Sequence, residues 1–207
     1  MNKIDRNKQM IEEIKSLNYK PKLLLHSCCA PCSSSVLERL VEFFDITIFF
    51  YNPNIDKEEE FKKRQDEEIR LINELNNKYS KNKIKIVTTN HNSDDYNKIV
   101  LGLENENEGG KRCEKCFFLR LSETANFAKQ NNFDYFTTTL TVSPHKNAEL
   151  LNEIGLKISE KFGIKFLVSD FKKEDGYKRS IELSKKYNLY RQDYCGCKFS
   201  KREKNDN

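Results

Sequence analysis

The chain has 207 residues, of which 37 are basic and 32 acidic, so its formal net charge at pH 7 is +5. This length suits one substantial domain with its own hydrophobic core, and the modest positive excess permits a nucleic-acid partner without requiring one. The N-terminus has no apolar stretch of the secretory type and no apolar run is long enough for a membrane span, so we expect a cytoplasmic protein with no membrane partner.

Apolar spacing in the first half of the chain predicts alternating helices and strands. A weak helical stripe over 3–18 indicates an N-terminal helical extension within residues 1–20. Beyond it we expect strands at 22–27, 45–51 and 83–89. A helix over 33–43 separates the first two strands, and a long charged helix with apolar residues on one face separates the second from the third.

The second half of the chain repeats this alternation. An exposed loop at 102–112, with a Gly-Gly pair, leads into a helix that starts near the CEKC motif. Strands are expected at 135–142 and 164–168, and helices at 148–162 and 175–187. The charged tail 201–207 is predicted to be disordered.

Strands that alternate with helices favour a parallel sheet covered by helices on both faces. We therefore predict one Rossmann-like α/β domain over residues 21–200. In such sheets ligands bind beyond the carboxyl ends of the strands. The CCAPC motif (28–32) follows the first predicted strand and TVSPHKN (141–147) the fourth, which predicts a metal site at this edge.

Seven cysteines form three tight groups in the sequence. They are Cys28, Cys29 and Cys32; Cys113 and Cys116; and Cys195 and Cys197. Cytoplasmic thiols are kept reduced, so this grouping favours metal binding or redox catalysis over structural disulfides. The odd number also argues against a fully paired disulfide framework.

The spacing of the first two groups is compatible with two kinds of metal centre. The C-x-x-C spacing that commonly binds one zinc ion occurs twice, at Cys29/Cys32 and at Cys113/Cys116. An iron–sulfur cluster also takes four ligands and tolerates varied spacing, so Cys28 and Cys29 could join the CEKC pair instead. A helix beginning at CEKC, beside Lys111 and Arg112, would favour thiolates there.

The third group, Cys195-Gly196-Cys197, places two thiols on either side of one glycine. A disulfide across so short a loop should be strained and easily reduced, which suits a pair that cycles electrons. Two further metal ligands are the alternative interpretation. His26, within the first predicted strand, is expected to be a buried, hydrogen-bonded histidine.

Five sequence blocks together resemble epoxyqueuosine reductase of the QueH family. They are HSCCAPCS (26–33), YNPNI (51–55), GGKRCEKCFFLRL (109–121), TTTLTVSPHKN (137–147) and YRQDYCGCKFS (190–200). The resemblance covers about residues 22–200. It implies an oxidoreductase that removes the epoxide oxygen from epoxyqueuosine at the wobble position of tRNA, in the final step of queuosine biosynthesis.

The resemblance also implies a set of roles. Cys28, Cys29, Cys113 and Cys116 would bind a 4Fe–4S cluster, and Cys195 and Cys197 would form a redox-active pair supplied by an unidentified electron donor. Cys32 is a candidate ligand of a second mononuclear metal, iron or zinc. Apart from the resemblance, position and residue type make five residues candidates for substrate binding, as proton donor, phosphate contacts or stacking surface: His145, Lys146, Arg120, Arg191 and Tyr194. Surface ion pairing or packing is the rival interpretation for each.

Two other functions remain in view. A zinc-stabilised, non-catalytic RNA-binding module would use the same C-x-x-C pairs. Another iron–sulfur enzyme that modifies tRNA, of the sulfur-inserting type, would need an ATP-binding glycine loop after the first strand. The chain has CCAPCSSS at that position, which disfavours this second alternative.

Overall fold

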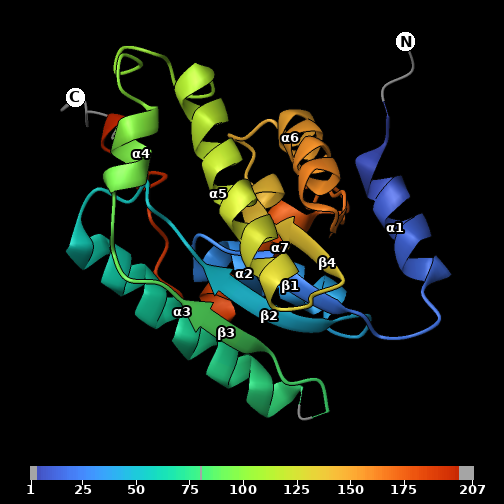
Figure 1. Cartoon of the computed structure of the whole chain (residues 1–207). Coiled ribbons are helices and arrows are strands. Elements are labelled where there is room, and N and C mark those ends of the chain that lie inside the picture. Colours follow the sequence, from blue (N-terminus) through green and yellow to red (C-terminus); the bar gives the residue numbers. More distant parts are fainter. Residues whose placement is uncertain (1–3, 80, 201–207) are drawn as a thin grey trace.

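The computed structural model describes residues 4–79 and 81–200, whose strands form one parallel sheet (Figure 1). The strands are β1 (Lys22–His26), β2 (Asp45–Phe50), β3 (Lys85–Thr88), β4 (Tyr135–Thr138) and β5 (Lys165–Phe166). Their order is β3-β2-β1-β4-β5, and every neighbouring pair is parallel. The chain thus builds outward from β1 to β3 and then crosses back to β4. The junction between β1 and β4 is the switch point at which such sheets bind ligands.

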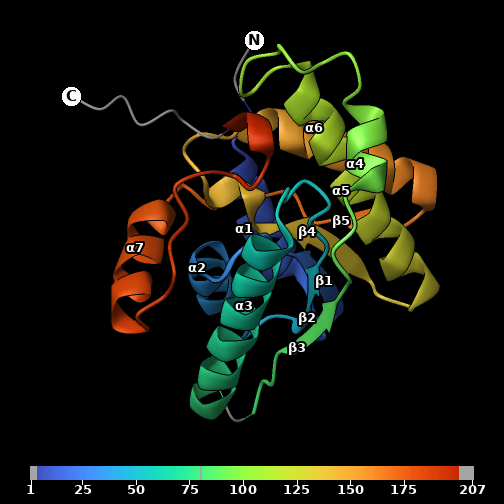
Figure 2. The same ribbon diagram turned by 90° about the vertical axis from the view of Figure 1, so that its left-hand side faces the viewer.

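Helices cover both faces of the sheet, as predicted (Figure 2). They are α1 (Arg6–Ser16), α2 (Ala30–Leu40), α3 (Glu58–Lys78), α4 (Asp94–Ile99), α5 (Lys111–Gln130), α6 (Ala148–Phe162) and α7 (Gly176–Lys186), with 3-10 turns η1 (Thr139–Val142) and η2 (Lys198–Ser200). Leu23 and Leu25 face a core that contains residues of α1, α2 and α3, whereas Leu24 faces the core under α5 and α6. This division follows from the alternation of side chains along a strand.

The described structure departs from the predicted elements at three places. The strand predicted over 135–142 ends at Thr138, because the Thr138 hydroxyl accepts a hydrogen bond from Leu140 N–H and the chain turns into η1. Helix α2 begins at Ala30 with Pro31 in its first turn, so Cys32 belongs to the helix. The short helix α4 was not predicted. The predicted disordered tail 201–207 lies outside the described residues.

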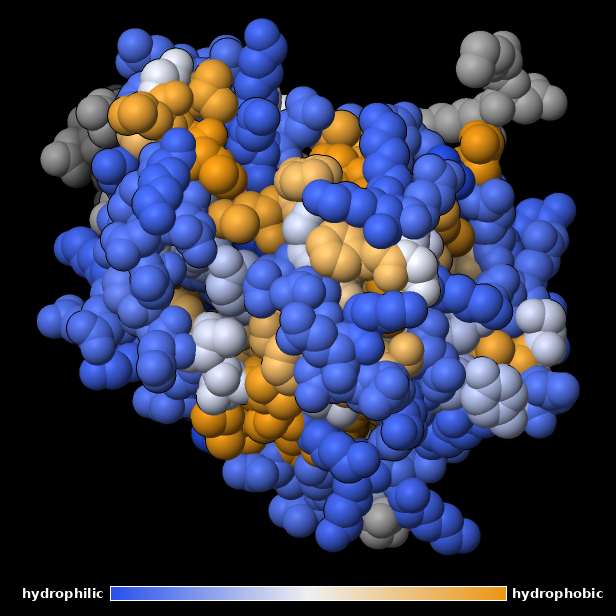
Figure 3. Space-filling model, viewed as in Figure 1, coloured by the Kyte–Doolittle hydropathy of each residue, from blue (hydrophilic) through white to orange (hydrophobic). Residues whose placement is uncertain are grey.

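Hydrophilic side chains cover most of the face seen in Figure 3, with apolar residues gathered in separate patches. Among the described helices, none combines the length and the hydrophobicity that a bilayer span requires.

Candidate metal and redox site

The loop that follows β1 places three cysteines around one point. The Sγ atoms of Cys28, Cys29 and Cys32 all lie within 4.8 Å of one another, and those of Cys28 and Cys29 are 3.7 Å apart. Cys29 is the N-cap of α2, and its carbonyl accepts hydrogen bonds from the N–H groups of Cys32 and Ser33. Because thiolates are soft ligands, this cysteine trio can hold a soft metal ion.

The trio concentrates its negative charge on Cys28. Hydrogen bonds with Cys29 and Cys32 hold the pKa of Cys28 well below its usual range, and the cations Lys146 and Arg120 act in the same direction. The same interaction with Cys28 raises the pKa of Cys29 to about 12, and it also raises that of Cys32. A single thiolate shared by three sulfur atoms is therefore the favoured state of the metal-free trio.

Arg120 is buried at the switch point, between two of the cysteine groups. Its Nη2 donates to Asn52 Oδ1 at 2.6 Å, and its Nε lies 3.2 Å from His26 Nε2. Its charge favours the thiolate forms of both Cys28 and Cys116. The guanidinium is thus a fixed positive charge shared by the first and second cysteine groups.

His26 supports Arg120 from within the sheet. The imidazole is fully buried, and its Nδ1 lies 2.9 Å from Thr138 Oγ1 at the end of β4. Burial and, to a smaller extent, the neighbouring Arg120 charge lower the pKa of His26 to about 3. The ring is therefore neutral at physiological pH, in agreement with the predicted buried, hydrogen-bonded histidine.

Cys113 and Cys116 lie in the first two turns of α5, which begins at Lys111 as expected. The N–H of Gly109 donates to Cys113 Sγ at 3.2 Å. Burial nevertheless raises the pKa of both thiols, that of Cys116 to about 11, so desolvation outweighs the predicted helix-end effect. Arg112 stabilises the loop before α5, because its Nη1 donates to the backbone carbonyls of Leu103, Glu104 and Glu106.

Cys195 and Cys197 are free thiols in the structure, like the other five cysteines. Tyr96 OH lies 2.8 Å from Cys197 Sγ, and Cys195 Sγ lies 3.0 Å from Ser200 Oγ. The hydrogen bond from Cys197, with help from the Lys146 charge, lowers the pKa of Cys195 to about 5. The pair therefore combines one thiolate with one protonated thiol.

Two adjoining cavities bring the three cysteine groups together. The larger one, of about 350 Å³, is lined by Cys28, Cys32 and Cys195, and by all five predicted substrate-binding residues, His145, Lys146, Arg120, Arg191 and Tyr194. The smaller one, of about 40 Å³, is lined by Cys113, Cys116, Cys195 and Cys197. Arg120, His145, Lys146 and Cys195 line both cavities. The seventh cysteine, Cys29, lines neither cavity but lies beside Cys28 and Cys32 in the trio.

The metal-ligand set remains partly a prediction. Among the described residues, the trio is the one group of three or more His, Cys, Asp or Glu ligand atoms that meet within 4.8 Å, and the other four cysteines join no such group. The four-cysteine cluster set and the ligand role of Cys32 are therefore expectations that the cavity geometry leaves open.

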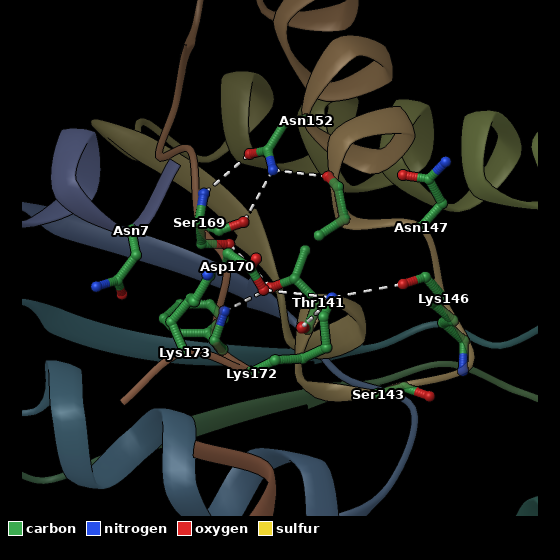
Figure 4. A network of polar contacts seen from close by, with 12 residues as sticks. Asn7, Thr141, Ser143, Lys146, Asn147, Asn152, Ser169, Asp170, Lys172 and Lys173 are labelled. Carbon is green, nitrogen blue, oxygen red and sulfur yellow. Dashed lines mark hydrogen bonds and ion pairs between the residues drawn. The ribbon is translucent and has the colours of Figure 1, made fainter. Parts of the chain in front are cut away.

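The segment that carries His145 and Lys146 is anchored through its backbone (Figure 4). Lys172 Nζ donates to the carbonyls of Thr141 and Lys146 at 3.4 and 3.5 Å. Asn152 on α6 bonds to both the N–H and the carbonyl of Ser169, which ties α6 to the chain after β5. The Lys146 side chain points away from this network. His145 is exposed and lines both cavities.

Several residues of the site were missed by sequence reasoning. Arg64 is 1% exposed and donates to the carbonyls of Cys195 and Tyr194, and Asn54 also donates to Cys195 O. Arg64 and Glu68 lie in the buried stripe of α3 among Phe61, Leu71, Ile72 and Leu75. Two charged residues at apolar positions of an amphipathic helix are the signal that would have identified them. Tyr96 lies on the unpredicted helix α4.

Comparison with known proteins agrees with this geometry. Residues 23–203 match the family model described as Epoxyqueuosine reductase QueH. The chain is 41% identical over 192 residues to the epoxyqueuosine reductase QueH of Streptococcus pyogenes, covering 93% of this chain and 75% of that protein. It is 44% identical over 183 residues to that of Staphylococcus epidermidis, covering 87% and 76%, and 36% identical over 187 residues to that of Thermotoga maritima, covering 89% and 92%. The chain belongs to the epoxyqueuosine reductase QueH family.

Proposed function

We propose that this protein reduces epoxyqueuosine to queuosine at the wobble position of tRNA, as the final step of queuosine biosynthesis. The observation that carries the proposal is the convergence of six cysteines from three chain segments on two adjoining cavities. The oxidoreductase family supplies the reaction class. A single nucleotide, unstacked from the anticodon loop, would enter the larger cavity.

The reaction needs two electrons and two protons. The epoxide loses its oxygen as water, both carbon–oxygen bonds break, and a carbon–carbon double bond forms. When the Cys195 thiolate and the Cys197 thiol become a disulfide, they release two electrons and one proton, and solvent supplies the second proton that the departing oxygen needs to leave as water. An external electron donor, still unidentified, would then reduce the disulfide again.

A cofactor fits the cysteine-rich lining. Cys28, Cys29, Cys113 and Cys116 would hold a 4Fe–4S cluster, and Cys32 would contribute to a second mononuclear metal, iron or zinc. The trio within 4.8 Å has the donor chemistry that such soft metals require. When bound, these groups would supply one-electron transfer and Lewis acidity.

The remaining residues of the cavity would bind and orient the nucleotide. Arg120 and Lys146 place positive charge beside Cys28, where it would stabilise negative charge on the departing oxygen. His145, Arg191 and Tyr194 lie along the larger cavity and would contact phosphate, ribose or base. The cytoplasm, where thiols stay reduced, is the compartment that this chemistry favours.

Anaerobic incubation with tRNA that contains epoxyqueuosine tests the proposal. After digestion, mass spectrometry of the wobble nucleoside should show the loss of one oxygen atom. Purified anaerobically, the protein should contain the iron and sulfide of one 4Fe–4S cluster, together with one further equivalent of iron or zinc for the second site. One zinc ion without sulfide, and an unchanged nucleoside, would instead indicate a zinc-stabilised RNA-binding module.

Serine variants separate the two cysteine roles. Cys195→Ser and Cys197→Ser should keep the cluster absorption but turn over much more slowly, because they lack the dithiol. Cys113→Ser is the matched comparison and should lose the cluster itself. Loss of the cluster in Cys195→Ser would contradict the redox role of the pair.

A further inference from the structure

A carboxyl group lies buried behind the cysteine trio. Glu68, in the middle of α3, is fully buried, and its Oε1 has no hydrogen-bond partner among the described residues. Its Oε2 lies 3.1 Å from Ser27 Oγ, and the Ser33 hydroxyl also hydrogen-bonds with the carboxyl group. The described part of the chain provides no ion pair for this side chain. A buried carboxyl whose partners are two hydroxyls and no cation is unusual, because it is desolvated with little compensation.

The serines that contact Glu68 belong to the segment that carries Cys28, Cys29 and Cys32. Ser27 Oγ lies 2.6 Å from Ser33 Oγ and accepts a hydrogen bond from Cys29 N–H at 3.3 Å. Ser33 Oγ in turn donates to the Cys29 carbonyl at 3.3 Å. Both serines are fully buried. The peptide groups on either side of the Cys29 side chain are therefore held by two hydroxyls whose common support is Glu68.

The stability of α3 does not explain this residue. Its neighbours in the buried stripe are apolar except for Arg64, which pairs with Glu60 instead, and a leucine of similar size would avoid the desolvation of a polar group. Burial raises the pKa of Glu68 to about 8, so that the group carries a proton at neutral pH. A neutral carboxyl can remain beside the Cys28 thiolate, where a second negative charge would be repelled.

We propose that Glu68 is a positioning residue: its hydrogen bonds orient Ser27 and Ser33, and through them hold Cys28 and Cys29 in the arrangement that binds metal. This inference rests on the proposed function only in taking the trio as a metal site. A role in proton delivery is disfavoured by the geometry, since the described cavities are lined by neither Glu68 nor the two serines.

Cobalt(II) binding to the reduced, metal-free protein tests the inference without RNA or turnover. The affinity is measured from the thiolate–cobalt charge-transfer absorption. The fraction of this absorption that is missing in Cys32→Ser is assigned to cobalt bound at the trio. Glu68→Leu should weaken binding by about 10- to 100-fold, the usual effect of losing a residue that orients metal ligands. Glu68→Gln keeps an uncharged group that can hydrogen-bond with Ser27 and should bind within about threefold of the unmodified protein.

The controls separate positioning from folding. Glu74→Leu removes another carboxylate on α3, which pairs with Arg70 and, within the described structure, has no hydrogen bond or ion pair with the cysteine-bearing segments, and should leave cobalt affinity unchanged. If Glu68→Leu does not fold, Ser27→Ala takes its place as the test variant. Its affinity for cobalt should be at least about tenfold lower than that of the unmodified protein.

Three outcomes would overturn the inference: full affinity in Glu68→Leu (or, where that variant does not fold, in Ser27→Ala), a loss in Glu68→Gln as large as in Glu68→Leu, or no cobalt signal that depends on Cys32. A protein that shows the expected cobalt pattern but leaves epoxyqueuosine unchanged would refute the proposed function and leave the role of Glu68 standing.

Discussion

At the scale of single residues, burial decides which ionisable groups are charged around the site. His26 is neutral because the sheet buries it, whereas Cys28 and Cys195 become thiolates because neighbouring thiols and Lys146 favour the charged form. Cys116, buried in an apolar cluster, has its pKa raised instead. The pKa of a cysteine in this site is thus lowered or raised according to its desolvation and the charges near it.

Glu68 gives a residue-scale prediction for pH dependence. Its pKa is about 8 in the folded protein against an ordinary value of 4.5, so between these values the unfolded chain releases a proton that the folded protein keeps. The free energy of unfolding of the metal-free protein should therefore fall, relative to that of Glu68→Gln, as pH rises through this window. The slope should be at most about 1.4 kcal/mol per pH unit.

Urea denaturation of both proteins at about pH 5 and about pH 8 measures this difference. Titrating cysteines are common to the two proteins and largely cancel in the comparison. A difference in unfolding free energy that does not change with pH would show that Glu68 is ionised in the folded protein.

At the scale of elements, the C-terminal segment docks on α3 and on the loop after β2. Asp56 N–H donates to Gly196 O at 3.0 Å, while Arg64 and Asn54 hold Cys195 O. Gly196 has φ +104°, and a Cβ there would lie 2.7 Å from Ile55 Cγ1. Only glycine allows the pair of cysteines to approach this surface so closely.

Gly196→Ala should therefore destabilise the docked segment. We expect the unfolding free energy to fall by about 2–4 kcal/mol, from the unfavourable φ and the contact with Ile55 together. Gly102→Ala is the matched control, since Gly102 also has positive φ (+79°), but a Cβ there would have no neighbouring atom within 4 Å. That variant should lose only about 1 kcal/mol. Equal losses, measured by denaturation, would rule out the Ile55 contact as the cause.

At the scale of the whole molecule, the parallel sheet gathers distant segments at one edge. The switch point between β1 and β4 receives the trio, and α5, the segment after η1 and the C-terminal loop complete the two cavities. In the lining of the larger cavity, the cations Lys146, Arg120 and Arg191 outnumber the carboxylates Glu108 and Asp193, on a chain whose net charge is only +5. The local arrangement of charge, rather than the total, favours an RNA partner here.

The salt dependence of RNA binding tests whether the positive residues of the larger cavity contact RNA phosphates. A synthetic anticodon stem-loop should bind less tightly to Lys146→Ala, and the slope of log affinity against log salt should drop by about one. Lys157→Ala, an exposed lysine on α6 remote from the cavity lining, should leave both affinity and slope unchanged. Fluorescence anisotropy over a salt series measures both. Identical slopes for the two variants would exclude a phosphate contact at Lys146.

Much of this protein could be predicted from local pattern alone. The periods of apolar residues are short-range properties, so they identified the five strands, most of the helices and the parallel α/β class. The motif blocks indicated the family, and the position of CCAPC directly after a strand predicted a site at the carboxyl edge of the sheet. His26 was correctly expected to be buried, because it belongs to a continuous apolar strand.

Only the tertiary structure decided how these parts act together. Whether Arg64 and Glu68 are solvated or buried depends on what packs against α3, and their neighbours come from residues far along the chain. The pKa values of the cysteines depend on desolvation and on charges such as Lys146, which lies more than a hundred residues from Cys28 in sequence. Sequence by itself determined the elements and the chemical types present, whereas the fold determined which thiols are charged and what holds them, because electrostatics and burial act through space.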